Sequence, residues 1–243
     1  CGQDVAALVE DLARQGRAPM LSLDCVPGSD WPVVTNVFAS RERIARIMGT
    51  DLANLHAEYQ RRANAPIPPE YVESGPVTEI VTEGDAVDLD QIPMIRHFDS
   101  DRGPYVTNAI IIAEDPETGV ANLSYHRSMR HAKNALATSL HSRGHLWRMY
   151  QIAREAGRPL PVAMVIGAHP LFMMAASARV AFGTDERAIA GALMGEALQV
   201  VRTPRHGIGV PAAAEFVLEG VLDPEAHVSE GPFGEFSGYS SDR

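Results

Sequence analysis

The chain has 243 residues, of which 45% are hydrophobic, enough to build one large domain or two small ones. Its 31 acidic residues outnumber its 21 Lys and Arg residues, so the formal net charge is −10. The sequence has no Lys- and Arg-rich run, which argues against nucleic acid as a partner, and no apolar run long enough for a membrane span.

The two cysteines, Cys1 and Cys25, are too few for a disulfide framework or a cysteine metal motif. No signal peptide opens the sequence, so we expect a reducing, cytoplasmic location. Because the first residue is Cys rather than Met, we also expect the sequence to be part of a longer protein.

Residues 1–97 are predicted to form a small α/β unit in which helices and strands alternate. Residues 4–15 have the apolar spacing of an amphipathic helix, and residues 19–26 and 32–38 are typical of strands. Ser40 is the expected N-cap of the next helix, and residues 51–63 are expected to form another. The Pro-rich, polar residues 64–76 indicate a linker or a long surface loop.

Residues 98–243 are predicted to mix β structure with inserted helices, as in an α+β, barrel-like domain. The clearest element is a hairpin in which the turn "PETG" separates the strands at 105–115 and 120–127. Three further helices are expected at 146–156, 169–178 and 185–195. The first ends at Gly157, and Thr184 is expected to cap the third. Three further strands are expected at 161–167, 197–202 and 214–222.

The stretch "SEGPFGEFSGY" places Glu230 and Glu235 around the sequence "GPFG". Its proline and glycines exclude a helix and make it a poor strand, which predicts a tight, kinked loop. A solvated loop with two acids is the ordinary interpretation. The alternative is that its aromatic residues raise the pKa of one carboxyl, which can then donate a proton, while a nearby Arg keeps the other ionised.

Three further positions leave two interpretations open. In "NLSYHR", a strand would point Asn122, Ser124 and His126 to one face, either as an exposed edge strand or as a functional polar surface. His145 begins a helix and could be a ligand or a polar surface residue. Glu186 lies in the first turn of a helix, where an acid complements the helix dipole. Spacing alone supports neither a metal site, a Ser hydrolase nor a dinucleotide fold.

The segments "PVVTNVFASRERIA", "NLSYHR", "VPAAAEFVLEGVL" and "EGPFGEFSGY" together resemble the UbiD-type decarboxylases, in the family's order and from about residue 32 to 239. The resemblance implies reversible decarboxylation of an aromatic, heteroaromatic or α,β-unsaturated carboxylic acid, with CO2 as product and prenylated FMN as cofactor. It also implies that the small N-terminal α/β unit precedes a split β-barrel-like domain that binds prenylated FMN.

By position, the resemblance implies a catalytic network of Arg127, Glu230 and Glu235. Glu235 would deliver the proton that replaces CO2 and Glu230 would pair with Arg127, although the two roles could be exchanged. A divalent cation, usually manganese, would be held by Asn122, His145 and Glu186, and potassium would lie near residues 176–178. The implied cofactor-binding residues are Thr107, Asn122, Ser124, Tyr125, Arg127, His145 and Phe236.

Family members continue well beyond the position of Arg243, so we expect a truncated flavin-binding domain here and a homo-oligomer when the protein is full length. A flavin prenyltransferase would supply the cofactor. Two other functions stay open: a non-catalytic module that binds flavin or a phosphate ligand, and a metal-dependent hydrolase. Flavin absorbance separates the hydrolase from the other two, and CO2 release separates the enzyme from the module.

Overall fold

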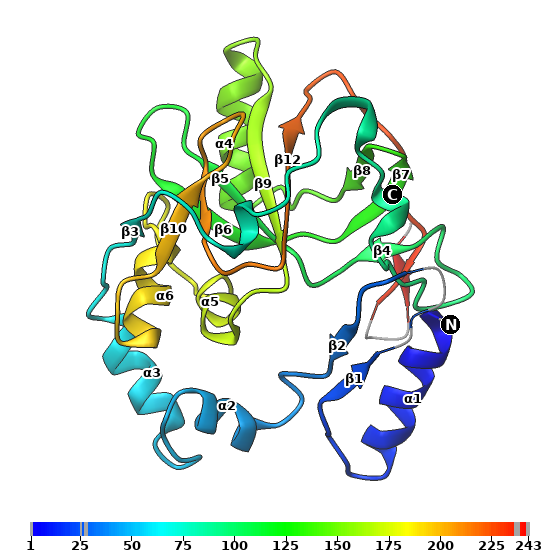
Figure 1. The fold of residues 1–243 in the computed structure, drawn as a ribbon, viewed down its shortest axis with the longest axis vertical. Coiled ribbons are helices and arrows are strands. Elements are labelled where there is room, and N and C mark those ends of the chain that lie inside the picture. Colours follow the sequence, from blue (N-terminus) through cyan, green and yellow to red (C-terminus); the bar gives the residue numbers. More distant parts are fainter. Residues whose placement is uncertain (1, 25, 27–28, 236–238, 242–243) are drawn as a thin grey trace.

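The computed structural model describes residues 2–24, 26, 29–235 and 239–241, which form a mixed α/β fold (Figure 1). No closed barrel is formed by the strands of these residues; they make separate sheets of two, three or four strands. The expected mixture of β structure and helices is therefore present, as open sheets packed against helices. None of the described helices is both long and apolar enough to cross a membrane.

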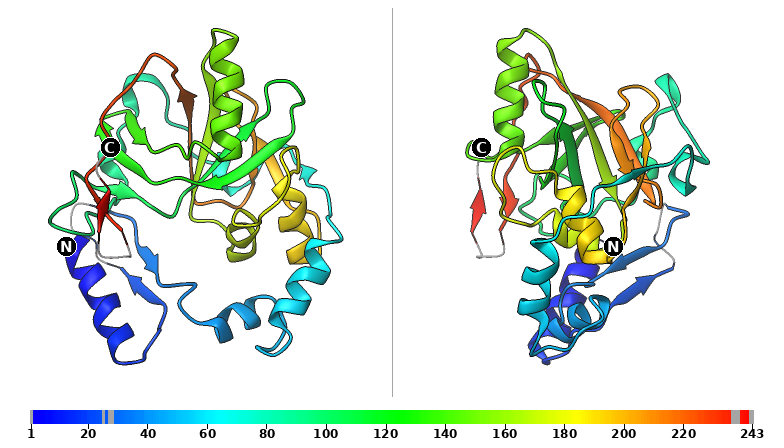
Figure 2. Two further views of the ribbon diagram at one scale, coloured as in Figure 1. Left: turned by 180° about the vertical axis from the view of Figure 1, so that it is seen from behind. Right: turned by 90° about the vertical axis from the view of Figure 1, so that its left-hand side faces the viewer.

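The N-terminal elements form an arm beside the sheets (Figures 1 and 2). They are α1 (Gly2–Arg14), the antiparallel pair β1 (Leu21–Leu23) and β2 (Val33–Thr35), α2 (Arg41–Ile47) and α3 (Leu55–Ala63). Ser40 is confirmed as the N-cap of α2, since its side chain accepts a hydrogen bond from the Arg43 amide. The next helix begins at Leu55 instead of 51, because the Asp51 carboxylate accepts the amide of Asn54 and stabilises a turn there.

The Pro-rich segment at 64–76 is tied into a sheet and is not only a loop. It contains β3 (Glu70–Tyr71), which lies parallel to β10 (Gln199–Arg202), and β10 pairs with β11 (Gly209–Pro211). Neither β3 nor β11 was predicted, because both are too short to show an alternating pattern. After β3 the chain forms three 3-10 helices, η1 (Pro76–Thr78), η2 (Gly84–Ala86) and η3 (Leu89–Gln91).

A four-stranded antiparallel sheet forms the centre of the molecule, in the order β12-β9-β5-β6. These strands are β12 (Phe216–Leu222), β9 (Leu160–Ile166), β5 (Ile110–Glu114) and β6 (Ala121–Tyr125), and the β5–β6 pair confirms the predicted hairpin. Ile111 lies opposite Ser124 on one side and Met164 on the other, so these three side chains share one face of the sheet.

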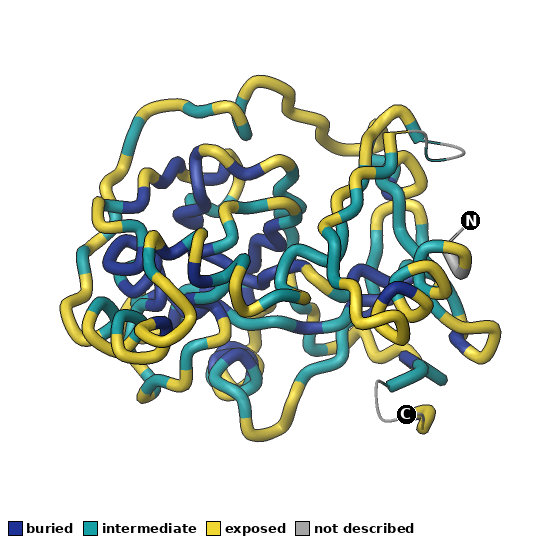
Figure 3. The backbone as a smooth tube through the Cα atoms, turned by 90° about the horizontal axis from the view of Figure 1, so that it is seen from below, coloured by how far each residue is buried: buried dark blue, intermediate teal, exposed yellow. Residues whose placement is uncertain are grey.

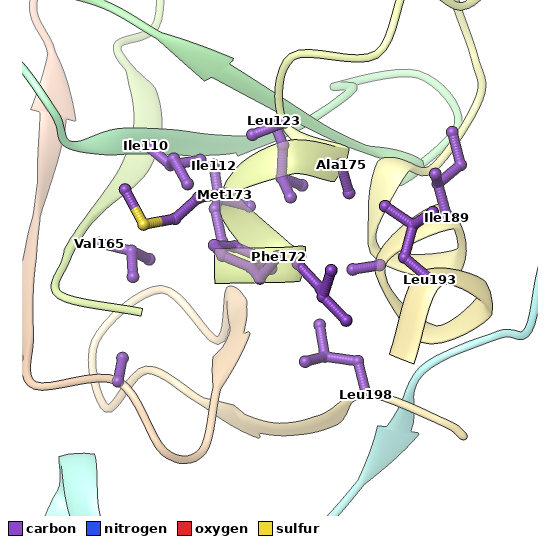
Figure 4. Packing of buried hydrophobic residues seen from close by; sticks show 14 of the residues in the cluster. Ile110, Ile112, Leu123, Val165, Phe172, Met173, Ala175, Ile189, Leu193 and Leu198 are labelled. Carbon is purple, nitrogen blue, oxygen red and sulfur yellow. The ribbon is translucent and has the colours of Figure 1, made fainter. Parts of the chain in front are cut away.

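The two faces of this sheet pack against different helices. One face contributes Ile110, Ile112 and Leu123 to a core cluster with α5 (Pro170–Ala175) and α6 (Glu186–Met194), in which Phe172 is central (Figure 4). The opposite face contributes Ile111 to a second cluster with α4 (His145–Glu155). Figure 3 shows that the buried residues are concentrated in this body, while the peripheral segments are exposed.

Two smaller sheets complete the described fold. One has the order β4-β7-β8, from β4 (Tyr105–Val106), β7 (Ser128–Ala132) and β8 (Ala135–Thr138), and the other pairs β13 (Phe233–Gly234) with β14 (Ser240–Ser241). One predicted cap is wrong: Asp185, and not Thr184, is the N-cap of α6, because its carboxylate accepts the amide of Arg187 at 2.9 Å. A carboxylate next to the first turn also complements the helix dipole.

Candidate active site

Arg127 joins the two glutamates of the kinked segment. It lies two residues beyond the end of β6, and its guanidinium grips Glu230 with two parallel hydrogen bonds, Nε to Oε1 at 2.9 Å and Nη2 to Oε2 at 3.0 Å. Its Nη1 atom donates to Oε1 of Glu235. The planar fork of arginine suits this arrangement, in which one cation serves two carboxylates.

The surroundings of the two carboxylates differ. The side chain of Glu230 is 8% exposed and that of Arg127 is 16% exposed, whereas that of Glu235 is 37% exposed. Burial opposes the charge of Arg127, but its hydrogen bonds and charge interactions with the two glutamates prevail and raise its pKa. The solvated-loop interpretation is therefore wrong for Glu230, which is a buried member of an ion pair.

Two aromatic rings pack against this network. The guanidinium of Arg127 lies 4.8 Å from the centre of the Phe233 ring, and that ring packs against Tyr105 at a centroid distance of 4.7 Å. Tyr105 is 1% exposed, and burial first, then the nearby Glu230 charge, raises its pKa to about 12. Its hydroxyl therefore stays protonated at neutral pH and can donate a hydrogen bond.

The segment between the glutamates is more regular than predicted. Phe233 and Gly234 pair with residues 240–241 as β13 and β14, and the Glu235 amide donates to the carbonyl of Tyr239 at 2.8 Å. The kink itself lies at Gly231, whose φ of +112° is a conformation that residues with a side chain rarely adopt. A sharp turn followed by a short strand thus presents both acids to Arg127.

A second polar cluster joins Asn122 of β6, His145 at the start of α4 and Glu186 at the start of α6. The Asn122 amide nitrogen lies 2.9 Å from Glu186 Oε1 and 3.5 Å from His145 Nδ1. The other Glu186 oxygen accepts the Leu123 amide at 3.0 Å. Three residues that spacing alone could not connect therefore meet at one point, because two helix N-termini face the same strand.

Glu186 is more than a helix-dipole partner. It is 2% exposed, and burial raises its pKa to about 7, although the Leu123 amide and the Asn122 side chain act in the opposite direction. Burying a carboxyl group in this way costs free energy unless a cation or several donors compensate it. Because burial of this carboxyl group is costly, its position indicates that Glu186 has a role beyond complementing the helix dipole.

The donors of this cluster suit a divalent cation. The Asn122 amide group points between an imidazole nitrogen and a carboxylate oxygen, and a 180° rotation of that amide would replace its NH2 by its carbonyl oxygen. One imidazole and two oxygen donors form a ligand set that manganese accepts. Across the described ranges no group of three or more His, Cys, Asp or Glu side chains is placed to hold a metal, so the amide is essential to this set.

The other predicted cofactor-binding residues lie in different places. Ser124 is on the Ile111 face of the sheet, and Thr107 is half-buried between β4 and β5. Tyr125 is on the opposite face, where its hydroxyl donates to the Met173 carbonyl at 2.8 Å, so only its backbone is left for a flavin contact. Phe236 lies outside the described residues. Residues 176–178, the expected potassium region, follow the end of α5.

Two further buried polar residues lie near this site, and sequence reasoning missed one of them, Asp101. His126 is 6% exposed; its Nδ1 lies 2.9 Å from the Ser139 carbonyl oxygen and its Nε2 lies 3.1 Å from the Ser124 hydroxyl. Asp101 is 1% exposed and accepts three backbone amides, one of them from Gly234. Strand alternation had already placed His126 on a polar face, whereas Asp101 belongs to no spacing pattern and only its burial reveals it.

A cavity of about 840 Å3 lies on the face of the sheet that carries Ser124. Ile111 and Met164 line it from that face, Trp147 and Tyr150 from α4, and Glu230 from the kinked segment. Cavities of this size commonly hold cofactors and small ligands. Through Glu230, the Arg127 network therefore reaches a cavity lined by both apolar and charged side chains.

Two family models match the chain. One, described as the 3-octaprenyl-4-hydroxybenzoate carboxy-lyase Rift-related domain (UbiD), matches residues 70–243. The other, described as the N-terminal domain of the same carboxy-lyase, matches residues 3–63. A phenolic acid decarboxylase of Streptomyces sp. (strain D7) is 34% identical over 98% of this chain and 52% of its own length.

Solved structures agree with these matches. HmfF of Pelotomaculum thermopropionicum, a UbiD-class enzyme in an evolved dimeric form with prFMN, has a TM-score of 0.91 and 35% identity over 98% of this chain and 55% of its own. The closed form of vanillic acid decarboxylase of Sedimentibacter hydroxybenzoicus has a TM-score of 0.93 and 30% identity over 98% of this chain and 53% of its own. The chain spans about half the length of the curated relatives it matches. Because the matching models account for most of its residues, the chain belongs to the UbiD family.

Proposed function

We propose that the protein to which this chain belongs is a prenylated-FMN-dependent decarboxylase that acts reversibly on an aromatic, heteroaromatic or α,β-unsaturated carboxylic acid. The observation that carries this proposal is the network in which Arg127 holds Glu230 bidentately and also reaches Glu235. The similarity to a phenolic acid decarboxylase and to a vanillic acid decarboxylase favours an aromatic acid as substrate.

The residues of this chain would do three things in the reaction. Glu235, the more exposed acid, would pass a proton to the carbon that CO2 leaves, taking it from solvent. Glu230, buried against Arg127, would hold the guanidinium in place. Phe233, the Tyr105 ring and the apolar cavity wall would keep water from the reacting carbon. When bound, the prenylated flavin would supply the electron sink for the loss of CO2.

The second cluster fits the phosphate end of the cofactor. Asn122, His145 and Glu186 would hold Mn2+ or another divalent cation, whose charge would compensate that of the phosphate. Asn122 and Arg127 lie on one nearly continuous segment, so the metal cluster and the acid network are at its two ends. Thr107, Ser124, the backbone of Tyr125 and Phe236 would line the flavin between them, and K+ would bind near residues 176–178.

Several finer features belong to the same proposal. Residues 98–243 would form part of a split barrel-like flavin-binding domain and residues 1–97 an N-terminal unit. The whole protein would be a cytoplasmic homo-oligomer, as the dimeric form described for the HmfF relative favours. A flavin prenyltransferase would supply its cofactor. The metal-dependent hydrolase is not favoured, because the matching family model describes a carboxy-lyase and the similar proteins are named decarboxylases.

The test uses the complete polypeptide co-expressed with a flavin prenyltransferase and incubated with a panel of carboxylic acids in heavy water. We expect a flavin absorbance band and deuterium incorporation into one aromatic acid. Arg127→Ala should lower incorporation by at least about 100-fold. Arg130→Ala should leave it within about twofold, because that arginine pairs with Asp90 at the surface.

Two results would contradict the proposal. Absence of a flavin band from the complete wild-type protein would show that the protein does not bind the proposed cofactor. A flavin band without deuterium incorporation from any acid in the panel would instead indicate a non-catalytic flavin-binding module.

A further inference from the structure

Asp101 is a buried carboxylate that neither the metal cluster nor the Arg127 network uses. It is 1% exposed and lies in the loop that leads into β4, beside the C-terminal strands (Figure 1). We propose that Asp101 is a positioning residue that holds the backbone of β13 so that Glu235 meets Arg127. This inference rests on the proposed function for its catalytic consequence, but its structural part is independent of any cofactor.

Both oxygens of Asp101 accept backbone amides from two separate segments. Oδ1 accepts the amide of Gly234 at 2.7 Å, and Oδ2 accepts the amides of His97 at 3.1 Å and Phe98 at 3.0 Å. A charged acceptor strengthens each of these bonds, and burial keeps water from competing for them. One side chain thus joins residues 97–98 to a strand more than a hundred positions further along the chain.

The loop around Asp101 is itself held at its base. Ile95 and Tyr105 form an isolated antiparallel bridge that closes it, and Tyr105 donates its amide to the Ile95 carbonyl at 2.8 Å. Inside the loop, the Arg96 side chain donates to the carbonyls of Asp101 at 3.0 Å and Asp99 at 2.8 Å. Asp101 therefore acts from a fixed platform, which is what a positioning residue requires.

Other contacts near Gly234 also hold β13 against the loop around Asp101. The Arg102 amide donates to the Pro232 carbonyl at 2.9 Å. A Cβ atom added at Gly234 would overlap the Phe98 ring, with two of its ring carbons only 3.0 Å away. The backbone from Pro232 to Gly234 is thus held by two hydrogen bonds and one close packing contact.

Glu235 is the residue that depends most on this restraint. Its neighbour Gly234 carries the Asp101 bond, while its own side chain, 37% exposed, makes one hydrogen bond within the described part of the chain, to Arg127. Glu230 has no such need, because a bidentate pair already fixes it. Small displacements of a catalytic group can cost about 100-fold in rate, so the Asp101 contact is expected to matter for turnover.

Asp101→Asn tests the inference with little change in shape. An amide has one acceptor oxygen and one NH2 group, so the variant keeps the two amides of residues 97 and 98 only by turning its NH2 toward the Gly234 amide, and that bond is lost. Asp115→Asn is the matched control: Asp115 is 3% exposed and also accepts two backbone amides, but it lies in the β5–β6 turn at the other end of β6.

Amide hydrogen exchange on the cofactor-free chain supplies the first measurement. We expect Asp101→Asn to speed exchange in the peptide covering residues 231–235 by about tenfold, the effect of losing one charge-assisted hydrogen bond. In Asp115→Asn one acceptor oxygen can still serve both amides, so exchange should stay near wild type at 115–119 and unchanged at 231–235. Unchanged exchange at 231–235 in Asp101→Asn, or an equal increase there in both variants, would overturn the inference.

Turnover of the complete holoenzyme supplies the second measurement. Asp101→Asn should lower kcat by about 10- to 100-fold and leave KM and flavin content near wild type, because only the proton donor is displaced. Local loosening together with wild-type kcat would overturn the positioning role. If the wild-type holoenzyme itself does not turn over, the proposed function fails, and the exchange measurement still decides whether Asp101 holds β13.

Discussion

Glu230 and Glu235 are identical side chains with different surroundings, and the roles proposed for them rest on this difference. Glu230 is nearly buried and shares two hydrogen bonds with Arg127, whereas Glu235 shares one and reaches solvent. A buried, bidentate partner keeps its position. A partly exposed acid can exchange its proton with water, which repeated proton delivery requires.

The first prediction compares the two Glu→Gln substitutions. Glu230→Gln should lower the free energy of unfolding by about 2 kcal/mol, because it removes the charged, bidentate partner of the half-buried Arg127 guanidinium. Glu235→Gln should lower it by less than about 1 kcal/mol, because solvent replaces part of the lost interaction. Urea unfolding of the two variants beside wild type measures the difference. Equal losses would contradict the assignment of different roles.

The second prediction concerns acid stability and His126. Burial lowers the pKa of His126 below its ordinary value of 6.5, although the hydrogen bond to Ser139 partly opposes this. As pH falls, the unfolded chain therefore binds the proton first. The stability that His126 contributes is complete above about pH 6.5 and is lost as pH falls through the folded-state pKa.

Urea unfolding at pH 7.5, 6.5 and 5.5 measures this contribution. Between pH 6.5 and 5.5, His126→Gln should lose less free energy of unfolding than wild type. His131→Gln, a substitution at an exposed histidine of β7, should keep the wild-type slope. Parallel pH profiles for all three proteins would contradict the prediction.

At the scale of elements, the conformation of the kinked segment is held by close packing between the loop at 96–104 and β13. Neither the loop at 96–104 nor β13 has a strong intrinsic preference for its conformation. Their backbone hydrogen bonds and the contact of Gly234 with Phe98 define the arrangement. The absence of a side chain at Gly234 is a requirement of packing and not of backbone flexibility.

The third prediction follows from this contact. Gly234→Ala should lower the free energy of unfolding by about 1–3 kcal/mol, because its methyl group overlaps the Phe98 ring. Phe98→Ala should recover most of this loss in the double variant. Gly220→Ala is the control, since a Cβ at that strand position would meet no atom within 4 Å. A loss that Phe98→Ala does not reduce would contradict the packing explanation.

At the scale of the whole molecule, the candidate metal cluster depends on three elements from distant parts of the chain. β6 contributes Asn122, and the first residues of α4 and α6 contribute His145 and Glu186. The two core clusters on opposite faces of the central sheet place these helices. A cation bound here should therefore stabilise the fold as a whole.

The fourth prediction is that Mn2+ raises the thermal unfolding temperature of the cofactor-free chain after treatment with a chelator. At 100 times its Kd, the ion should add about 2.7 kcal/mol to the free energy of unfolding. His145→Ala should abolish the increase, and His131→Ala, on the exposed side of β7, should keep it. An increase that survives in His145→Ala would contradict the proposed ligand set.

Local sequence was sufficient for the hairpin of β5 and β6, the Ser40 cap and the helices of the second half. Each depends on residues within a few positions of one another. It was insufficient for β3 and β11, whose strand character comes only from pairing with β10. The sequence also favoured Thr184 over Asp185 as the N-cap of α6. Which of two adjacent capping residues accepts the first amide is decided by the backbone conformation at the start of the helix.

The sequence by itself determined the residues of the candidate site, through segments that resemble one family, and the kink that proline and glycine impose near Glu230. Only the tertiary structure decided that Arg127 meets a carboxylate 103 positions away, that Asn122 meets another 64 positions away, and that Asp101 supports the loop. The reason is physical. Local backbone preferences depend on neighbouring residues, whereas contacts between distant residues depend on which faces of the central sheet become buried together.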